Sequence, residues 1–211
     1  MKNEEPKIRV VIVDDHPTFR MGLAALVASQ PDMAVEREFD AAEDLLSAWS
    51  NNLTDIVLMD LRMPGMGGVE ATLALLSRDP HARVIVLTTF DTDEDIFRAI
   101  QSGAKSYLLK DMSTSVVVGT IRDVYEGRGK LPEVVASRLN EREQRQTLSE
   151  RENEVLIALV KGRSNKEISK ELFISEETVK SHLKTLFSKL GVHDRTEAAI
   201  NAIRQGIVHL D

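Results

Sequence analysis

The sequence contains no cysteine among its 211 residues, which excludes disulfide bridges and thiolate metal sites. Aromatic residues are also scarce, at 4% of the chain. No apolar run approaches the ~20 residues that a membrane-spanning helix needs. The charged first seven residues are not followed by an apolar segment ending in a cleavage site, so we expect no signal peptide. These absences favour a cytoplasmic protein with no membrane partner.

The formal net charge of −7 is unevenly distributed along the chain. Residues 147–211 hold ten Lys or Arg and ten Asp or Glu, so the whole acidic excess lies in residues 1–146. An acidic protein can still bind DNA if its positive charge is gathered on one surface. The bulk charge therefore argues neither for nor against a nucleic-acid partner.

The first 126 residues alternate between short apolar runs and helical patterns. The runs are short and mostly rich in β-branched residues, as in Ile8–Val13, which favours strands over helices. Alternating strands and helices predict an α/β fold, a doubly wound five-stranded parallel sheet covered on both faces. The predicted strands are 8–13, 33–39, 55–59, 83–87 and 105–109, and the predicted helices are 17–29, 41–50, 68–77, 93–102 and 113–126.

The alternation stops at the Gly-Arg-Gly-Lys segment 127–130. Residues 131–146 have the pattern of a short helix followed by a polar, charged stretch, which is typical of a linker. Residues 147–211 show only helical patterns and predict a small all-α domain of four helices. We therefore expect a first domain over 1–126, a linker over 127–146 and a second domain over 147–211. Helix-start signatures occur at Ser149 with Glu152, Ser164 with Glu167 and Asp194 with Glu197, and a further helix begins after Ser175.

Acidic side chains directly follow two predicted strands of the first domain. Asp14 and Asp15 follow the first strand, and Asp60 follows the third. If the strand order is 2-1-3-4-5, these strands are neighbours where the order reverses, and the three carboxylates converge there. Clustered carboxylates repel one another unless a cation joins them, and Mg2+ prefers such oxygen ligands. Thr88 and Lys110, after the fourth and fifth strands, add a hydroxyl and an ammonium that suit a bound phosphoryl group.

At these positions the chain resembles the receiver domain of response regulators, which has a flavodoxin-like fold. The matching segments are Val-Asp-Asp-His at 13–16, the stretch 58–68 around Asp60, Leu-Thr-Thr at 87–89 and Ser-Tyr-Leu-Leu-Lys at 106–110. They occur in the family's order and spacing across roughly residues 7–126. One departure is Asp111, where many receivers carry proline.

The resemblance implies a role for each matching residue. Asp60 would be the nucleophile that accepts phosphate from a histidine kinase as an acyl phosphate. Tyr107 would be the switch aromatic, which turns inward when Thr88 moves. The implied Mg2+ ligands are Asp15, Asp60 and the backbone carbonyl of Arg62, with Asp14 helping through a water or a hydrogen bond, and the implied phosphoryl-binding residues are Thr88 and Lys110.

The second domain contains two helical patterns joined by a short turn, which predicts a helix-turn-helix. A short helix at 165–172 is followed by a turn at 173–175 and a longer helix at 176–190. Apolar residues of the longer helix recur at helical spacing and predict a core-facing side. Lys180 and Lys184 lie four residues apart on the other side, with Ser181 beside them, which suits a helix facing phosphates in a major groove.

This domain resembles the output domain of the NarL/FixJ group, also called LuxR-type. The segments that match are Leu-Ser-Glu-Arg-Glu at 148–152, Asn-Lys-Glu-Ile-Ser at 165–169, Val-Lys-Ser-His-Leu at 179–183 and Lys-Leu-Gly-Val at 189–192. The resemblance implies binding to double-stranded DNA, and pairing of subunits on DNA through the last helix. The implied DNA contacts are Lys180, Ser181 and Lys184 at the groove, and Asn165, Lys166 and Thr178 nearer the backbone.

The expected function is therefore a transcription factor, and not an enzyme, whose DNA binding is controlled by phosphorylation of Asp60. We expect the phosphorylated form to be a homodimer. It would pair through the first or fifth helix, or through the face formed by the fourth helix, the fifth strand and the fifth helix.

Three alternative functions remain. A haloacid-dehalogenase-type phosphatase needs an acid two residues after the nucleophile, where this chain has Arg62. A LuxR-type ligand receptor and a receiver that works without phosphate are less consistent with the acidic site.

Overall fold

The computed structural model describes residues 6–50, 54–89, 92–143 and 148–208, without the side chains of 141–143. The described residues form two compact units, which are considered separately. The strands are β1 (Ile8–Val13), β2 (Met33–Phe39), β3 (Ile56–Met59), β4 (Val84–Thr88) and β5 (Ser106–Leu109). The helices are α1 (Pro17–Ala28), α2 (Ala42–Ala48), α3 (Gly68–Arg78), α4 (Asp93–Gln101), α5 (Thr114–Tyr125), α6 (Glu133–Glu143), α7 (Glu150–Val160), α8 (Asn165–Glu171), α9 (Glu176–Leu190) and α10 (Arg195–Arg204).

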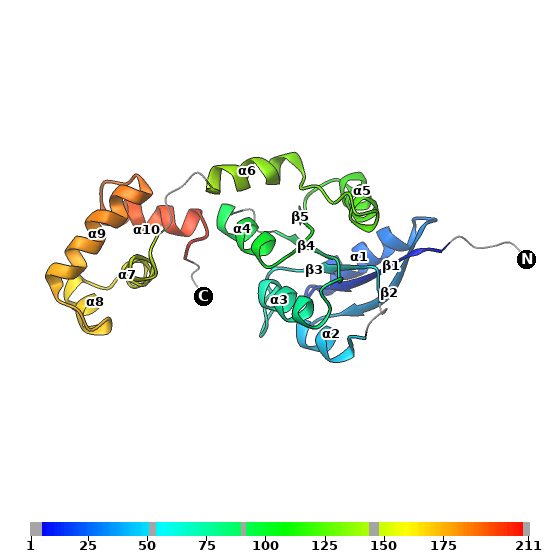
Figure 1. Cartoon of the computed structure of the whole chain (residues 1–211), viewed down its shortest axis with the longest axis horizontal. Coiled ribbons are helices and arrows are strands. Elements are labelled where there is room, and N and C mark those ends of the chain that lie inside the picture. The colour runs from blue at the N-terminus through cyan, green and yellow to red at the C-terminus, as the bar shows by residue number, and fades with distance from the viewer. Residues whose placement is uncertain (1–5, 51–53, 90–91, 144–147, 209–211) are drawn as a thin grey trace, which may run out of the picture. The chain divides into compact units, whose positions relative to one another are not determined.

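The first unit is built on a parallel sheet with the strand order β2-β1-β3-β4-β5 (Figure 1). Successive residues of a strand point to opposite faces, and both faces of this sheet are buried. Val10 and Ile12 belong to the core under α1 and α5, whereas Val11 and Val13 belong to the core under α2 and α3. This confirms the predicted doubly wound α/β fold, with element bounds within a few residues of those expected.

The strand order reverses between β1 and β3, and this point fixes the position of the acidic residues. Val13, the last residue of β1, is in register with Met59, the last residue of β3. The Asp60 amide donates to the Val13 carbonyl at 2.8 Å. The two strands therefore end side by side, and the aspartates that follow them enter the same crevice.

A glycine permits the close approach of α3 to this crevice. Gly68 is the first residue of α3, and its amide donates to the Leu61 carbonyl at 2.8 Å. A Cβ atom at position 68 would lie 2.2 Å from the backbone carbonyl oxygen of Asp60. Any larger residue would push α3 away from the peptide that carries Asp60.

The second unit contains α7, α8, α9 and α10 around one apolar core (Figure 1). Ser149, Ser164, Ser175 and Asp194 each accept a backbone N–H three residues ahead, so all four predicted helix starts are present. Val179, Leu183 and Leu186 of α9 are buried. The helix-turn-helix is therefore formed by α8 and α9, with their turn at 172–175.

The segment predicted as a linker contains α6, which agrees with the short helix expected there. Part of its polar stretch, residues 144–146, lies outside the described residues, as does the proposed first residue of the second domain. The bounds 1–126, 127–146 and 147–211 remain a prediction. No described helix combines the length and apolar character that crossing a bilayer requires.

Candidate phosphorylation site and nucleic-acid interface

Asp14, Asp60 and Lys110 form a buried ion-paired cluster at the carboxyl ends of β1, β3 and β5. The Lys110 Nζ lies 2.7 Å from Asp14 Oδ2 and 2.8 Å from Asp60 Oδ2. The side chain of Lys110 is only 8% exposed, and those of Asp14 and Asp60 are less exposed still. One ammonium thus faces two carboxylates, so the cluster retains a net negative charge. Because the side chains are buried, little water screens that charge.

The electrostatics of Asp60 reflect this excess of negative charge. Burial raises the pKa of Asp60 above that of an ordinary aspartate, and the nearby charge of Asp14 raises it further. The hydrogen bond from Lys110 acts in the opposite direction without cancelling the rise. The ionised carboxylate of Asp60 is therefore held at a free-energy cost, which another bound cation would offset.

Asp15 and the backbone of Arg62 border the same cluster. The Oδ1 of Asp15 is buried and accepts no hydrogen bond of good geometry from the described residues. The Arg62 amide lies 3.5 Å from Asp60 Oδ1, which places the start of the β3–α3 loop beside the carboxylate. A buried oxygen without a well-oriented hydrogen bond from the described residues, next to two further carboxylates, fits a hard oxygen-ligated cation such as Mg2+.

Thr88 lies on β4, which pairs with β3, and Tyr107 lies on β5, which pairs with β4. Thr88 is fully buried at the end of β4, and its carbonyl accepts the Lys110 amide at 2.8 Å. Tyr107 pairs with Val86 across β4 and β5 and is also fully buried. The structure therefore places Thr88 beside the backbone of Lys110, and shows Tyr107 with its ring inside the protein.

Two neighbours of the cluster were not assigned from sequence. His16, which directly follows the paired aspartates, has its Nδ1 2.8 Å from Asp15 Oδ1. The ring of Phe19 lies 4.6 Å from Lys110 Nζ, a distance at which a cation and an aromatic face attract. His16 was recognisable from its place in the chain, whereas nothing in the sequence indicates that α1 brings Phe19 to Lys110.

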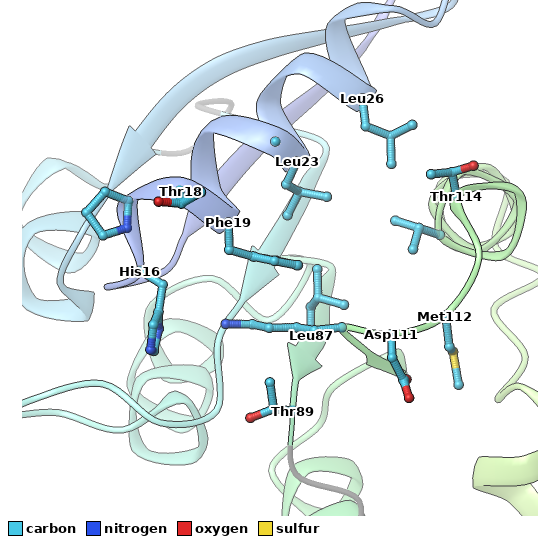
Figure 2. A pocket seen from close by; sticks show the side chains of 14 residues that line it. His16, Thr18, Phe19, Leu23, Leu26, Leu87, Thr89, Asp111, Met112 and Thr114 are labelled. Carbon is cyan, nitrogen blue, oxygen red and sulfur yellow. The ribbon is translucent and has the colours of Figure 1, made fainter.

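A cavity of about 800 Å3 adjoins the cluster between α1 and the β5–α5 connection. Figure 2 shows Phe19, Leu23 and Leu26 of α1 projecting toward Leu87 and Met112, with His16 at the other end. Lys110 is part of its wall. The apolar lining lies beside the stem of Lys110, while the ammonium remains with the carboxylates.

In the second unit, α9 presents a charged side opposite its buried residues. Lys180, Ser181 and Lys184 are exposed, as sequence spacing predicted, and so is Lys166 near the start of α8. Asn165 and Thr178 are half-buried near the first turns of α8 and α9. All six residues predicted to contact DNA therefore lie on α8 and α9.

An ion pair between two helices supports the position of α9. The Lys189 Nζ lies 2.7 Å from Glu152 Oε2, and Glu152 also closes the capping box of α7 with Ser149. The hydrogen bond from Lys189 lowers the pKa of Glu152, and the bonds with Ser149 add to this effect. The spacing of Ser149 and Glu152 predicted the capping box, whereas no pattern in the sequence predicts the pairing of Glu152 with Lys189.

Comparison with known proteins agrees with both parts of this architecture. Residues 10–122 match the response regulator receiver domain, and residues 146–202 match the bacterial regulatory proteins of the luxR family. The chain is 39% identical to the transcriptional regulatory protein LiaR of Bacillus subtilis, over 96% of this chain and 100% of LiaR. It is 37% identical to the response regulator protein VraR of Staphylococcus epidermidis, over 95% and 99% of the two chains.

Among solved structures, the response regulator ChrA of a heme-sensing two-component system is similar, with 40% identity and a TM-score of 0.58. That match covers 97% of this chain and 100% of ChrA. The chain therefore belongs to the response regulators that join a receiver domain to a LuxR-type DNA-binding domain. Of the relatives named above, LiaR is described as a transcriptional regulatory protein, and VraR and ChrA are described as response regulators.

Proposed function

We propose that Asp60 is the phosphoacceptor of this regulator and that a sensor histidine kinase is the donor. The observation that carries the proposal is the cluster at the strand ends in which the Lys110 ammonium contacts both Asp60 and Asp14. An oxygen of Asp60 would attack the phosphorus of a phosphohistidine, forming the acyl phosphate while the P–N bond breaks and the imidazole leaves. Lys110 would then shift from pairing with the free carboxylate to neutralising the phosphoryl oxygens, with the Thr88 hydroxyl as donor.

The oxygen atoms of the same cluster would hold Mg2+. Asp14, Asp15, Asp60 and the backbone carbonyl of Arg62 offer the oxygen ligands that this ion prefers. Bound there, the ion supplies positive charge against the carboxylates and the incoming phosphoryl oxygens. The buried Oδ1 of Asp15 and the raised pKa of Asp60 support this assignment.

A small phosphoryl donor such as acetyl phosphate tests the assignment directly. With Mg2+, the mass of the protein should increase by one phosphoryl group, and Asp60→Asn should take none because an amide cannot form the acyl phosphate. Asp111→Asn is a matched control, because Asp111 is an exposed aspartate next to Lys110. Undiminished labelling of Asp60→Asn, or labelling that survives removal of divalent ions, would contradict the proposal.

We further propose that α9 enters the major groove of double-stranded DNA, with Lys180, Ser181 and Lys184 facing it. Their exposure opposite the buried Val179 and Leu183 supports this orientation. Under this proposal Asn165, Lys166 and Thr178 lie nearer the DNA backbone. Such helices commonly place their first residues at base edges.

The salt dependence of DNA binding distinguishes contacts with phosphates from contacts with bases. A lost phosphate contact should reduce the log–log salt slope by about one. A lost base contact should instead weaken specific binding by about 1–3 kcal/mol and hardly change binding to random DNA. Lys180→Ala and Lys184→Ala should show one of these effects, and Lys105→Ala, an exposed lysine of the sheet unit, should show neither. Parental binding of both variants at every salt concentration would place the interface elsewhere.

We also propose that phosphorylation favours a homodimer, since output domains of this type commonly bind two half-sites. Sedimentation with and without a phosphoryl mimic tests this, and an unchanged monomer with unchanged DNA affinity would contradict it.

A regulator that acts on DNA in the cytoplasm, without enzymatic activity of its own, is the function that these residues support best. The expected bounds are testable by limited proteolysis, which should cut within 127–146 first.

A further inference from the structure

The imidazole of His16 points into the acidic cluster, although the place of His16 at the start of α1 does not require this contact. It is the N-cap residue of α1, yet its side chain makes no capping hydrogen bond. Its Nδ1 lies 2.8 Å from Asp15 Oδ1, 3.4 Å from Asp14 Oδ1 and 3.8 Å from Asp60 Oδ2. One ring nitrogen thus faces all three carboxylates, while the side chain stays 68% exposed and accessible from solvent.

The separations of 2.8 and 3.4 Å are those of atoms that share a metal ion, and the separation of 3.8 Å is a few tenths of an ångström longer. With metal–ligand bonds of ~2.0–2.2 Å, neighbouring ligands lie about 3 Å apart in octahedral geometry and about 3.5 Å apart in tetrahedral geometry. One ligand atom from each of Asp14, Asp15, His16 and Asp60 lies within 4.8 Å of the others. The backbone holds this arrangement, because the His16 amide donates to Asp14 Oδ1 at 2.8 Å.

Lys110 does not compete with the imidazole for all of these oxygens. Its ammonium lies at the Oδ2 atoms of Asp14 and Asp60. His16 lies near the Oδ1 atoms of Asp14 and Asp15, and the Asp15 atom is the buried oxygen that accepts no well-oriented hydrogen bond from the described residues. Lys110 and His16 therefore contact the cluster mainly through different atoms.

A nitrogen ligand changes which ions the cluster prefers. Carboxylates and carbonyls suit Mg2+, Ca2+ and Mn2+, whereas imidazole suits Zn2+ and the later transition ions. We propose that His16 is a fourth side-chain ligand that makes this site bind borderline divalent ions, Zn2+ above all, more tightly than an all-oxygen receiver site would. This inference rests on the proposed metal site, and it means that such ions displace Mg2+ from the receiver.

The test measures binding of Zn2+ and Mg2+ separately, by calorimetry at about pH 8, to the full chain and to His16→Asn and His16→Ala. A ligating imidazole must be neutral, which sets the choice of pH. We expect Zn2+ affinity to fall at least tenfold in both variants, with Mg2+ affinity changed less than twofold or increased. His81→Ala is the matched control, because His81 is an exposed histidine outside the cluster. Both His16 variants should fold, since the side chain is largely exposed and caps nothing.

Nuclear magnetic resonance of nitrogen-labelled histidine gives a readout independent of affinity. Zn2+ should shift the Nδ1 signal of one histidine, and that signal should be the one missing from His16→Asn. Three results would overturn the inference while leaving the Mg2+ site intact. They are an equal loss of Zn2+ and Mg2+ affinity in the His16 variants, no loss of Zn2+ affinity in them, and an unshifted His16 signal at saturating Zn2+. Failure of Mg2+ itself to bind, with no effect of Asp60→Asn, would instead refute the proposed metal site and this inference with it.

Discussion

Replacing Lys110 by methionine is expected to destabilise the receiver unit by roughly 3 kcal/mol, near the lower end of what removing one partner of a buried ion pair produces. Methionine keeps an apolar stem against the Phe19 ring, so the change is mainly one of charge. The loss should be large because Lys110 is only 8% exposed and compensates both Asp14 and Asp60, at 2.7 and 2.8 Å. Without it, two buried carboxylates face each other with no intervening cation.

The pH dependence of stability should change in a defined direction. The folded pKa of Asp60 is already raised, so its contribution to stability is full below the pKa of an unfolded aspartate and is lost as pH rises through the folded value. Removing Lys110 removes the principal influence that lowers this pKa. The unfolding free energy of Lys110→Met should therefore fall more steeply than that of the parent as pH rises from about 4.

The assay is urea unfolding followed by the fluorescence of Trp49, the single tryptophan of the chain. Trp49 packs against the core under α2 and α3, so its signal reports on the receiver unit alone. Mg2+ should recover part of the lost stability, by about 2.7 kcal/mol at a hundredfold excess over its dissociation constant. Lys105→Met, at an exposed lysine, should stay within about 0.5 kcal/mol of the parent. If Lys110→Met matched this control, and Mg2+ stabilised neither protein, the account of the cluster would be wrong.

Four further substitutions test other parts of the structure by the same kind of unfolding measurement. Gly22→Ala should stabilise the receiver unit by about 0.5–1 kcal/mol, because a Cβ there meets nothing within 4 Å in α1, whereas Gly68→Ala should destabilise it by clashing with the backbone at 2.2 Å. Phe173→Gly should stabilise the helical unit by about 1 kcal/mol, since this residue has a φ of 54° and is 93% exposed; an unchanged midpoint would argue against strain there. Glu152→Gln should lower stability at neutral pH. The loss should shrink as pH falls below the ordinary pKa of a glutamate and through the lower folded value, because a lowered pKa contributes stability that is lost on protonation. Circular dichroism of the helical unit checks this, and a pH-independent loss would contradict it.

Much of the fold was predictable because its signals are local. The apolar run at 8–13 is long enough for one buried strand, and a serine with a glutamate three residues later marks a helix start wherever it occurs. The meeting of Asp14 with Asp60 was also predictable, because parallel strands that are neighbours at a reversal end at the same edge. The charged side of α9 followed from the spacing of Lys180 and Lys184 alone.

Tertiary packing decided the contacts between residues that lie far apart in the chain. It brought one ammonium, that of Lys110, within 2.8 Å of both Asp14 and Asp60, and it placed the Phe19 ring on that ammonium. It also turned the imidazole of His16 toward three carboxylates and buried Tyr107 completely. The residue types and their order determined that an acidic site would exist, because local patterns set the strands and their ends. Which atoms meet there, and so which cations the site can hold, depends on how α1 and the end of β5 are placed relative to the ends of β1 and β3. No local pattern encodes that placement.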